Sequence, residues 1–452
     1  MNKKTLILYL LLTTNLLLGS VLGNKTKESS LIVYNDNIAL VHEERALSVN
    51  RGDREIIYKG VANTIDTDSV NIDLPDSVTL YSQQYRFDKL SQRKLLDTYI
   101  GKKVIVRVQK DTKNFKKIKA KLLSSGGTYS LVETKSSEII SVANKDIIFK
   151  AIPTQLITKP SLVWNISAKK DLNSKVKLDY LIKNIKWKSN YILNLKNNRA
   201  TLDGWITISN RSGKRFKNTK LYVLAGKINR VQQPKIMYKT LRSARVESMA
   251  MPSKHSHEGY HFYNIPFRVD IANNETTQIK FINKQELNVK RKYTSVMTNP
   301  NYLYGEKKHG ISQYIHIKGV DFALPKGIIR TYSKLKDTNI LLGETDIGHT
   351  PKNTPLDLKL GENFDLKATE TILSRDDTKQ YRDATVKYTV KNSAKELKNI
   401  EILVPFNKNK TSIIETKKSY SFTKGKFISF KLSLKGESSK DFQVHFRDFI
   451  NF

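Results

Sequence analysis

Apolar and polar residues alternate with a period of two along much of this chain, and this feature constrains its fold more than any other. Val104, Val106 and Val108 follow the pattern, and so does the stretch 176–180. In 428–434 alternate positions are again apolar, with serine and lysine between them. Because successive side chains of a strand point to opposite faces, each run forms one apolar and one hydrated face. Antiparallel sheets that bury a single face have this pattern.

Clusters of turn-forming residues separate these runs at 50–53, 125–127, 210–213 and 423–426. Many short strands between such turns predict β-sandwiches or barrels, so the expected fold class is all-β. A chain of 452 residues also exceeds the size at which one hydrophobic core stops growing. We therefore expect an N-terminal β region over 24–155 and two antiparallel β-sandwiches, over 156–300 and 301–452.

One helix is expected within this β pattern, over 91–100. Ser91 suits its N-cap, apolar residues recur at helical spacing up to Ile100, and Gly101 suits the left-handed residue after its end. Five short strands are expected directly afterwards, over 103–109, 118–123, 128–133, 139–142 and 147–149. A short helix followed by five strands resembles a small Sm-like or SH3-like barrel, here over 102–150. Such barrels often bind RNA or peptides, but the fold alone does not determine the ligand.

Residues 1–23 have the pattern of a secretory signal peptide. A basic start precedes an apolar run over 6–18, and Val21 and Gly23 suit the −3 and −1 positions of a cleavage site. The alternative is an uncleaved membrane anchor, although the run is shorter than the ~20 residues that span a bilayer. We expect export to the periplasm or the cell surface, with no transmembrane span after cleavage.

The composition excludes some kinds of site and favours certain ligands. The chain has no cysteine, which excludes disulfides, iron–sulfur clusters and thiolate metal sites. Its formal net charge of +37 attracts polyanions such as nucleic acid, anionic lipid and acidic polysaccharide. Single lysines spread along the chain are also what solvated strand faces contain. The basic barrel over Tyr99–Phe149 is the place where such charge is expected to bind a polyanion, if any does.

The segment His257-Glu258-Gly259-Tyr260-His261 matches the H-E-x-x-H motif of zinc metallopeptidases. That chemistry needs a helix, which brings both imidazoles to one zinc ion and lets the glutamate polarise the bound water. A nearby proline and Gly259 oppose a helix, and in one extended strand His257 and His261 would stand ~13 Å apart. His257, Glu258 and His261 are therefore weak metal candidates, and no cofactor is expected.

Other catalytic patterns are missing from the sequence, which has no G-x-S-x-G elbow, no P-loop and no dinucleotide fingerprint. The longest stretch without a strand period is 231–258, which we expect to be an exposed loop. Arg242, Arg245, Met249 and Met251 lie in it and form a candidate binding surface. The three tryptophans occur in strand-like runs, where packing between two sheets is expected rather than stacking on a ligand.

Several stretches follow one another in a family-like order: 180–181, 187–191, 202–210, 224–226, 324–327, 343–344, 349–352 and 360–365. They resemble the bacterial domain of unknown function 4139, and 38–43 and 99–102 resemble the region that often precedes it. The resemblance implies an exported, β-rich protein without an established reaction. Some relatives are labelled mucoidy-inhibitor-like, which implies a link to envelope or capsule polysaccharide.

These observations predict an exported cell-envelope protein that binds or supports other molecules and has no catalytic activity. The expected partner is an envelope protein or an acidic polysaccharide. Nucleic acid is disfavoured, because an exported protein rarely meets it. Two alternatives remain: a zinc-dependent hydrolase that uses His257, Glu258 and His261, and a protein that binds polyanions through the basic barrel.

Overall fold

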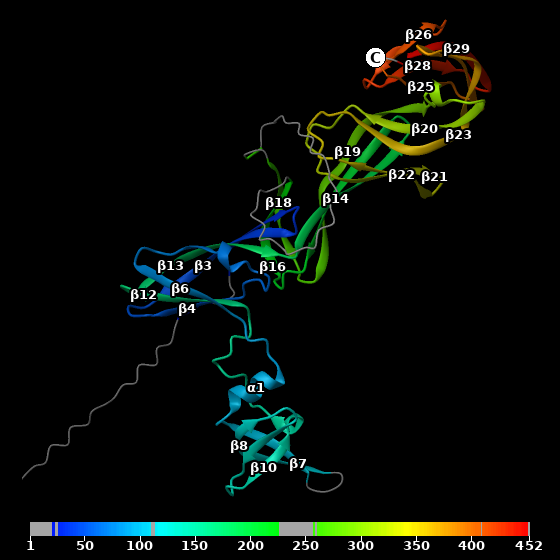
Figure 1. The fold of residues 1–452 in the computed structure, drawn as a ribbon. Coiled ribbons are helices and arrows are strands. Elements are labelled where there is room, and N and C mark those ends of the chain that lie inside the picture. Colours follow the sequence, from blue (N-terminus) through cyan, green and yellow to red (C-terminus); the bar gives the residue numbers. More distant parts are fainter. Residues whose placement is uncertain are drawn as a thin grey trace, which may run out of the picture. The chain divides into compact units, whose positions relative to one another are not determined.

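The computed structural model of this chain describes residues 20–22, 26–109, 114–225, 256–257, 260–407 and 409–450. It is almost entirely β-structure arranged in several mainly antiparallel sheets, which confirms the predicted fold class (Figure 1). The described part of the chain contains one α-helix, α1 (Gln92–Tyr99), and the short 3-10 turns η1 (Thr67–Ser69), η2 (Asn144–Asp146) and η3 (Pro300–Tyr302). None of the described helices is long and apolar enough to cross a membrane.

The chain folds into two compact units that are built from alternating segments. The first comprises Met1–Lys186, Ser209–Val231 and Tyr260–Thr277, and the second comprises Trp187–Ile208, Gln232–Gly259 and Gln278–Phe452. This division differs from the three consecutive segments expected from the sequence. The chain passes repeatedly between the units, so a boundary drawn at one sequence position cannot separate them.

Two sheets contain the strands that matter most for the site described below, and all of their strands except β17 belong to the first unit. The seven-stranded sheet has the order β17 (Ser256–His257), β18 (Tyr260–Ile271), β16 (Phe216–Ala225), β2 (Glu28–Tyr34), β3 (Ile38–Val49), β13 (Leu172–Lys183) and β5 (Asn71–Asp73). The four-stranded sheet has the order β1 (Ser20–Leu22), β4 (Glu55–Lys59), β12 (Ser161–Ala168) and β6 (Val78–Arg86).

The buried faces of these two sheets meet around large side chains. Trp164 of β12 and Tyr58 of β4 are both fully buried, and their ring centroids lie 5.4 Å apart. From β3, the guanidinium of Arg45 lies 3.7 Å from the centroid of the Tyr58 ring. The strand β13 alternates as predicted, with Val176, Leu178 and Tyr180 buried. The core between the sheets is therefore aromatic and, unusually, also contains charge.

The first unit also includes a five-stranded sheet in the segment where the sequence predicts a small barrel, and we keep the name small barrel for this segment. Its five strands have the order β10 (Ile139–Ala143), β9 (Tyr129–Glu133), β8 (Phe115–Ser125), β7 (Lys103–Gln109) and β11 (Ile147–Ile148). After η2 the chain returns so that β11 pairs with β7. Figure 1 shows α1 grouped with these strands, and its residues Leu96 and Tyr99 join their core. Ser91 caps α1 by accepting a hydrogen bond from the Lys94 amide at 3.2 Å, and Gly101 adopts φ +79°, as expected.

The second unit contains most of a thirteen-stranded sheet with two hydrophobic cores. The main path is β22 (Thr338–Ile347), β21 (Gly327–Leu335), β14 (Ile185–Lys196), β15 (Arg199–Asn210), β19 (Glu275–Val296), β20 (Glu306–Ile317), β23 (Leu356–Asp377), β24 (Tyr381–Asn392), β29 (Ser438–Phe449) and β26 (Thr411–Glu415). Beside it, β25 (Lys398–Pro405) pairs with β19 and β28 (Phe427–Leu434), and β27 (Ser421–Thr423) pairs with β28.

The long strands β19 and β23 contribute to both cores of the second unit. Val289 of β19 and Leu358 of β23 belong to the core that includes Tyr191, whereas Tyr293 and Leu366 of the same two strands belong to the core that includes Phe430. A strand of 22 residues is long enough to cross two cores in succession, at ~3.3 Å per residue. The position 300/301 consequently does not divide one core from the other.

Candidate functional site

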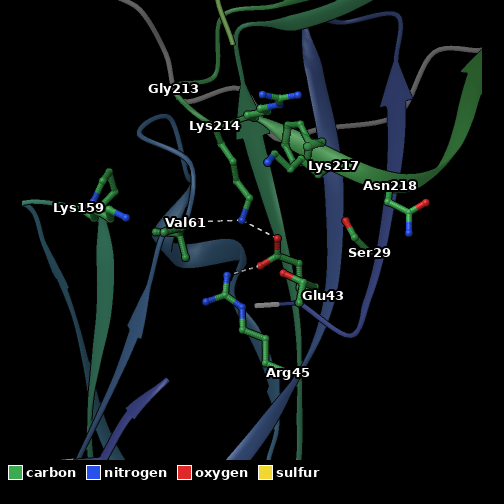
Figure 2. A pocket seen from close by; sticks show the side chains of 14 residues that line it. Ser29, Glu43, Arg45, Val61, Lys159, Gly213, Lys214, Lys217 and Asn218 are labelled. Carbon is green, nitrogen blue, oxygen red and sulfur yellow. Dashed lines mark hydrogen bonds and ion pairs between the residues drawn. The ribbon is translucent and has the colours of Figure 1, made fainter. Parts of the chain in front are cut away.

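A cavity of about 650 Å³ opens on the first unit beside the strands β2, β3 and β16 (Figure 2). Its lining comes from five separate parts of the chain: β2 with the residues before it, β3, the residues that follow β4, the residues that precede β12, and the segment from Gly213 to Asn218. Most of the charged side chains among them are basic: Arg45, Lys159, Lys214, Arg215 and Lys217, against the single carboxylate of Glu43. The cavity is therefore electropositive.

Glu43 and Arg45 lie on the apolar face of β3. The alternation that buries Val41 and Leu47 places these two residues between them, so both charged side chains point into the space between the two sheets. Each is only 2% exposed. A charge removed from water at this depth destabilises the fold by several kcal/mol unless partners replace the lost hydration.

The carboxylate of Glu43 has three partners, which come from three different places in the chain. Arg45 donates from Nη2 to Oε2 at 2.8 Å, and the hydroxyl of Tyr58 donates to the same oxygen at 2.9 Å. The ammonium of Lys214 lies 2.5 Å from Oε1. Figure 2 shows Glu43 between Lys214 and Arg45. The network thus links β3 to β4 of the other sheet and to the loop that leads into β16.

The two cations also bind backbone and hydroxyl oxygens. Lys214 donates to the Gly60 carbonyl at 2.8 Å and to the Tyr180 hydroxyl at 3.3 Å, which together with Glu43 accounts for its three ammonium protons. Arg45 donates from Nη1 to the Lys59 carbonyl at 2.6 Å. Both cations therefore hold the end of β4 as well as the carboxylate.

The protonation states follow from burial and from the partners. Burial by itself raises the pKa of the Glu43 carboxyl, but the neighbouring cations Lys214 and Arg45 outweigh it and bring that pKa to about 2. Burial lowers the pKa of the Lys214 ammonium, and Glu43 opposes this effect. For Tyr58, burial and the adjacent Glu43 carboxylate raise the phenol pKa far above its ordinary value. At neutral pH we therefore assign Glu43 as ionised and Tyr58 as neutral.

This cluster has an excess of one positive charge, because two cations share one carboxylate. A carboxylate that two cations hold ionised is a weak proton acceptor, so Glu43 is unsuited to act as a general base. The hydroxyl of Ser29 is already engaged with Thr219 at 2.9 Å. The chemistry that the lining supports best is the binding of an anion, through the excess charge of the cluster and the lysines Lys159 and Lys217.

The sequence-predicted metal candidates fall partly outside the described residues. His257 lies in β17 and His261 in β18, whereas Glu258 is not among the residues that the structure describes. The motif residues that are described thus lie in strands and not in the helix of a metallopeptidase. The strands β17 and β18 are neighbours in the sheet, so the ~13 Å separation expected for one continuous strand does not apply. The zinc site stays a prediction.

The other predicted binding surface is not described either. Arg242, Arg245, Met249 and Met251 all lie outside the described residues. Elsewhere in the described part of the chain, no group of three or more histidine, aspartate or glutamate side chains is placed to hold a metal ion.

Sequence reasoning missed the cluster around Glu43, although one signal was present. In the run from Val41 to Leu47, the period-2 face reads valine, glutamate, arginine, leucine. Two opposite charges at alternate positions of an apolar face indicate a buried ion pair, because a buried strand face rarely accepts an unpaired charge. No comparable signal existed for Lys214, which lies 169 residues after Arg45 in a loop.

No protein-family model matches this chain, and no curated protein matches it. The resemblance to the domain of unknown function 4139 therefore stays a prediction that rests on the sequence alone.

We predict that Glu43→Gln destabilises the first unit by about 3–5 kcal/mol, because it leaves Lys214 and Arg45 buried without their carboxylate. Trp164 reports on this unit in a Trp187→Phe, Trp205→Phe background, since both removed tryptophans belong to the second unit. Urea unfolding followed by Trp164 fluorescence measures the change. The matched control is Glu28→Gln, whose half-exposed carboxylate pairs with Lys220 at 3.0 Å and should change the stability far less, because water solvates that pair. Equal effects of the two changes would contradict a structural role for the buried cluster.

The stability of the first unit should also fall in acid. The carboxyl pKa of Glu43 is about 2 in the folded protein against an ordinary value of 4.5, so its contribution is complete above pH 4.5 and is lost as the pH falls from there to about 2. The difference corresponds to about 3 kcal/mol, at about 1.4 kcal/mol per pH unit. Urea midpoints from Trp164 fluorescence between pH 5.5 and pH 2.5 test this. A flat stability over that interval would show that Glu43 is not held ionised.

Proposed function

We propose that this protein is an exported binding protein of the cell envelope, without a reaction of its own, and that its first unit holds an anionic group in the cavity beside Glu43. One observation carries the proposal: the buried cluster has an excess positive charge, and the exposed charges of the surrounding lining are basic. The leader pattern of residues 1–23 supports export. The resemblance to an exported family without a known reaction agrees with both parts.

The electrostatic field is stronger inside the cavity than on an open surface. Protein walls have a lower dielectric constant than water, so the same positive charges attract an anion more strongly there. A volume of about 650 Å³ lies within the range of roughly 300–1,000 Å³ that small-ligand sites have. Lys159 and Lys217 are exposed, so both side chains are accessible to a ligand from solvent. A carboxylate-bearing sugar fits this charge and this size.

Export is tested by fractionation of cells that express the full chain. We expect the protein in the envelope or periplasmic fraction, with a mass and an N-terminal residue that correspond to cleavage between Gly23 and Asn24. Such cleavage removes β1, whose residues pair in parallel with Ile56–Tyr58 of β4, and leaves β4 at the edge of its sheet. Recovery of the intact chain from the cytosol would contradict the proposal.

Anion binding is tested by calorimetry with the purified protein and galacturonate, with galactose as the uncharged probe. We expect saturable binding of galacturonate alone, weakened by salt because the contact is electrostatic. The double change Lys159→Gln, Lys217→Gln should weaken it by roughly tenfold, because two charge-assisted contacts are removed. The control Lys169→Gln, Lys170→Gln alters two exposed lysines of the same unit. Equal binding of galactose, or an equal loss in the control, would refute an anion site in the cavity.

A further inference from the structure

The outer face of the small barrel contains a row of lysines that the cavity does not explain. Along β7 and β8 the side chains of Lys103, Lys117, Lys119 and Lys121 are all exposed, on the face opposite the apolar core. Alternate residues of a strand are about 6.6 Å apart. The three lysines of β8 therefore form a regularly spaced line of positive charge.

The strand register places like charges directly opposite each other. Lys103 of β7 pairs with Lys121 of β8, and Arg107 pairs with Lys117. Directly opposed side chains have Cβ atoms roughly 4.5–5.5 Å apart, and like charges in this position destabilise a sheet. Two carboxylates lie beside the row: Asp146 binds Arg107 with both Nε and Nη2, at 3.0 and 2.8 Å, and Glu133 of β9 is the register partner of Lys121. Within the described residues, the four lysines take part in no ion pair.

Exposed apolar side chains flank the lysine row on the same outer surface. Tyr129 and Leu131 of β9 and Ile139 of β10 are 60%, 43% and 63% exposed. Their strands follow β8 in the sheet order. Since the barrel has a complete core of its own around Val106 and Leu122, these residues are not needed to fill it. The face thus offers cations and an apolar strip to one ligand.

We propose that this face, defined by Lys103, Lys117, Lys119 and Lys121, binds an acidic polysaccharide. The inference rests on the export part of the proposed function, but it concerns a different site from the cavity. A long chain with repeated carboxylates neutralises several lysines of the row at once, and the apolar faces of its sugar rings pack on Tyr129, Leu131 and Ile139.

The side chains favour this occupant over single-stranded nucleic acid. Bidentate recognition of phosphate depends on the guanidinium fork of arginine, and the one arginine of the row is already bound to Asp146 and lies 5.0 Å from the Phe115 ring centroid. Binding of single strands also relies on aromatic platforms for successive bases. Along the apolar strip, Tyr129 is the one aromatic residue among the three.

The test uses the purified mature chain and immobilised polygalacturonate, at several salt concentrations. We expect binding that weakens steeply with salt, because a polyanion releases condensed counterions when lysines neutralise it. The affinity should fall by roughly tenfold or more when Lys103, Lys117, Lys119 and Lys121 are all changed to Gln. The control changes four exposed lysines of the second unit to Gln: Lys334, Lys367, Lys379 and Lys391. Both variants lose the same net charge. If the barrel face is the binding site, the affinity falls strongly in the first variant and only slightly in the second.

Three outcomes would overturn the inference. Equal losses in the two variants would show that only the net charge of the protein matters. Tighter binding of oligothymidylate than of polygalacturonate through the same four lysines would assign the face to nucleic acid. Binding to vesicles of anionic phospholipid, in preference to polygalacturonate, would assign it to a membrane surface. The cavity variant Lys159→Gln, Lys217→Gln should leave polygalacturonate binding within roughly twofold, so failure at this face and failure of the proposed cavity site are distinguishable.

Discussion

A carboxylate can remain ionised between two sheets only when cations and hydrogen-bond donors replace the water that it loses. Glu43 meets this condition through Arg45, Lys214 and Tyr58. These partners belong to β3, to the loop before β16 and to β4, so the requirement of one buried charge determines how three distant segments meet. Removing any one partner leaves the others uncompensated. The cluster therefore links the two sheets of the first unit.

The same cluster determines the sign of the cavity. Two cations for one carboxylate leave an excess charge that no other buried group cancels within the described lining. The Glu43 carboxyl is held ionised with a pKa of about 2, so at neutral pH it compensates one of the two neighbouring positive charges and leaves the other. The anion binding proposed for the cavity would therefore use the same residues that link the two sheets. The exposed lysines of the lining, Lys159 and Lys217, can be changed without removing a partner of Glu43.

In the small barrel, the residues that stabilise the fold and the charged residues of the surface are different. Its core is apolar, around Val104, Val106 and Leu122, and its charges are on the outside, where opposed lysines weaken the pairing of β7 and β8. A sheet that tolerates such repulsion must be stabilised by its core. Binding of the proposed polysaccharide to this face would relieve that repulsion.

Strands, the helix and the barrel could be predicted from the sequence because their signals are local. The period of two, the Ser91 cap and Gly101 each involve residues a few positions apart. The expected burial of the tryptophans holds for Trp164 and Trp187, which are buried. Trp205 is half-buried, and the ammonium of Lys280 lies 5.4 Å from its ring centroid. Domain limits could not be predicted in this way, because β19 and β23 each serve two cores and the chain passes repeatedly between the units.

The sequence by itself determined the β-rich fold class, the position of α1 and the excess of positive charge. Only the tertiary structure decided which charges meet: that Lys214 reaches Glu43 across 171 residues, and that Lys103 faces Lys121 across a strand pair. The physical reason is that alternation tells which face of a strand is buried but not which strand lies opposite. Long-range pairing depends on how whole sheets pack, and the candidate sites of this protein are products of that packing.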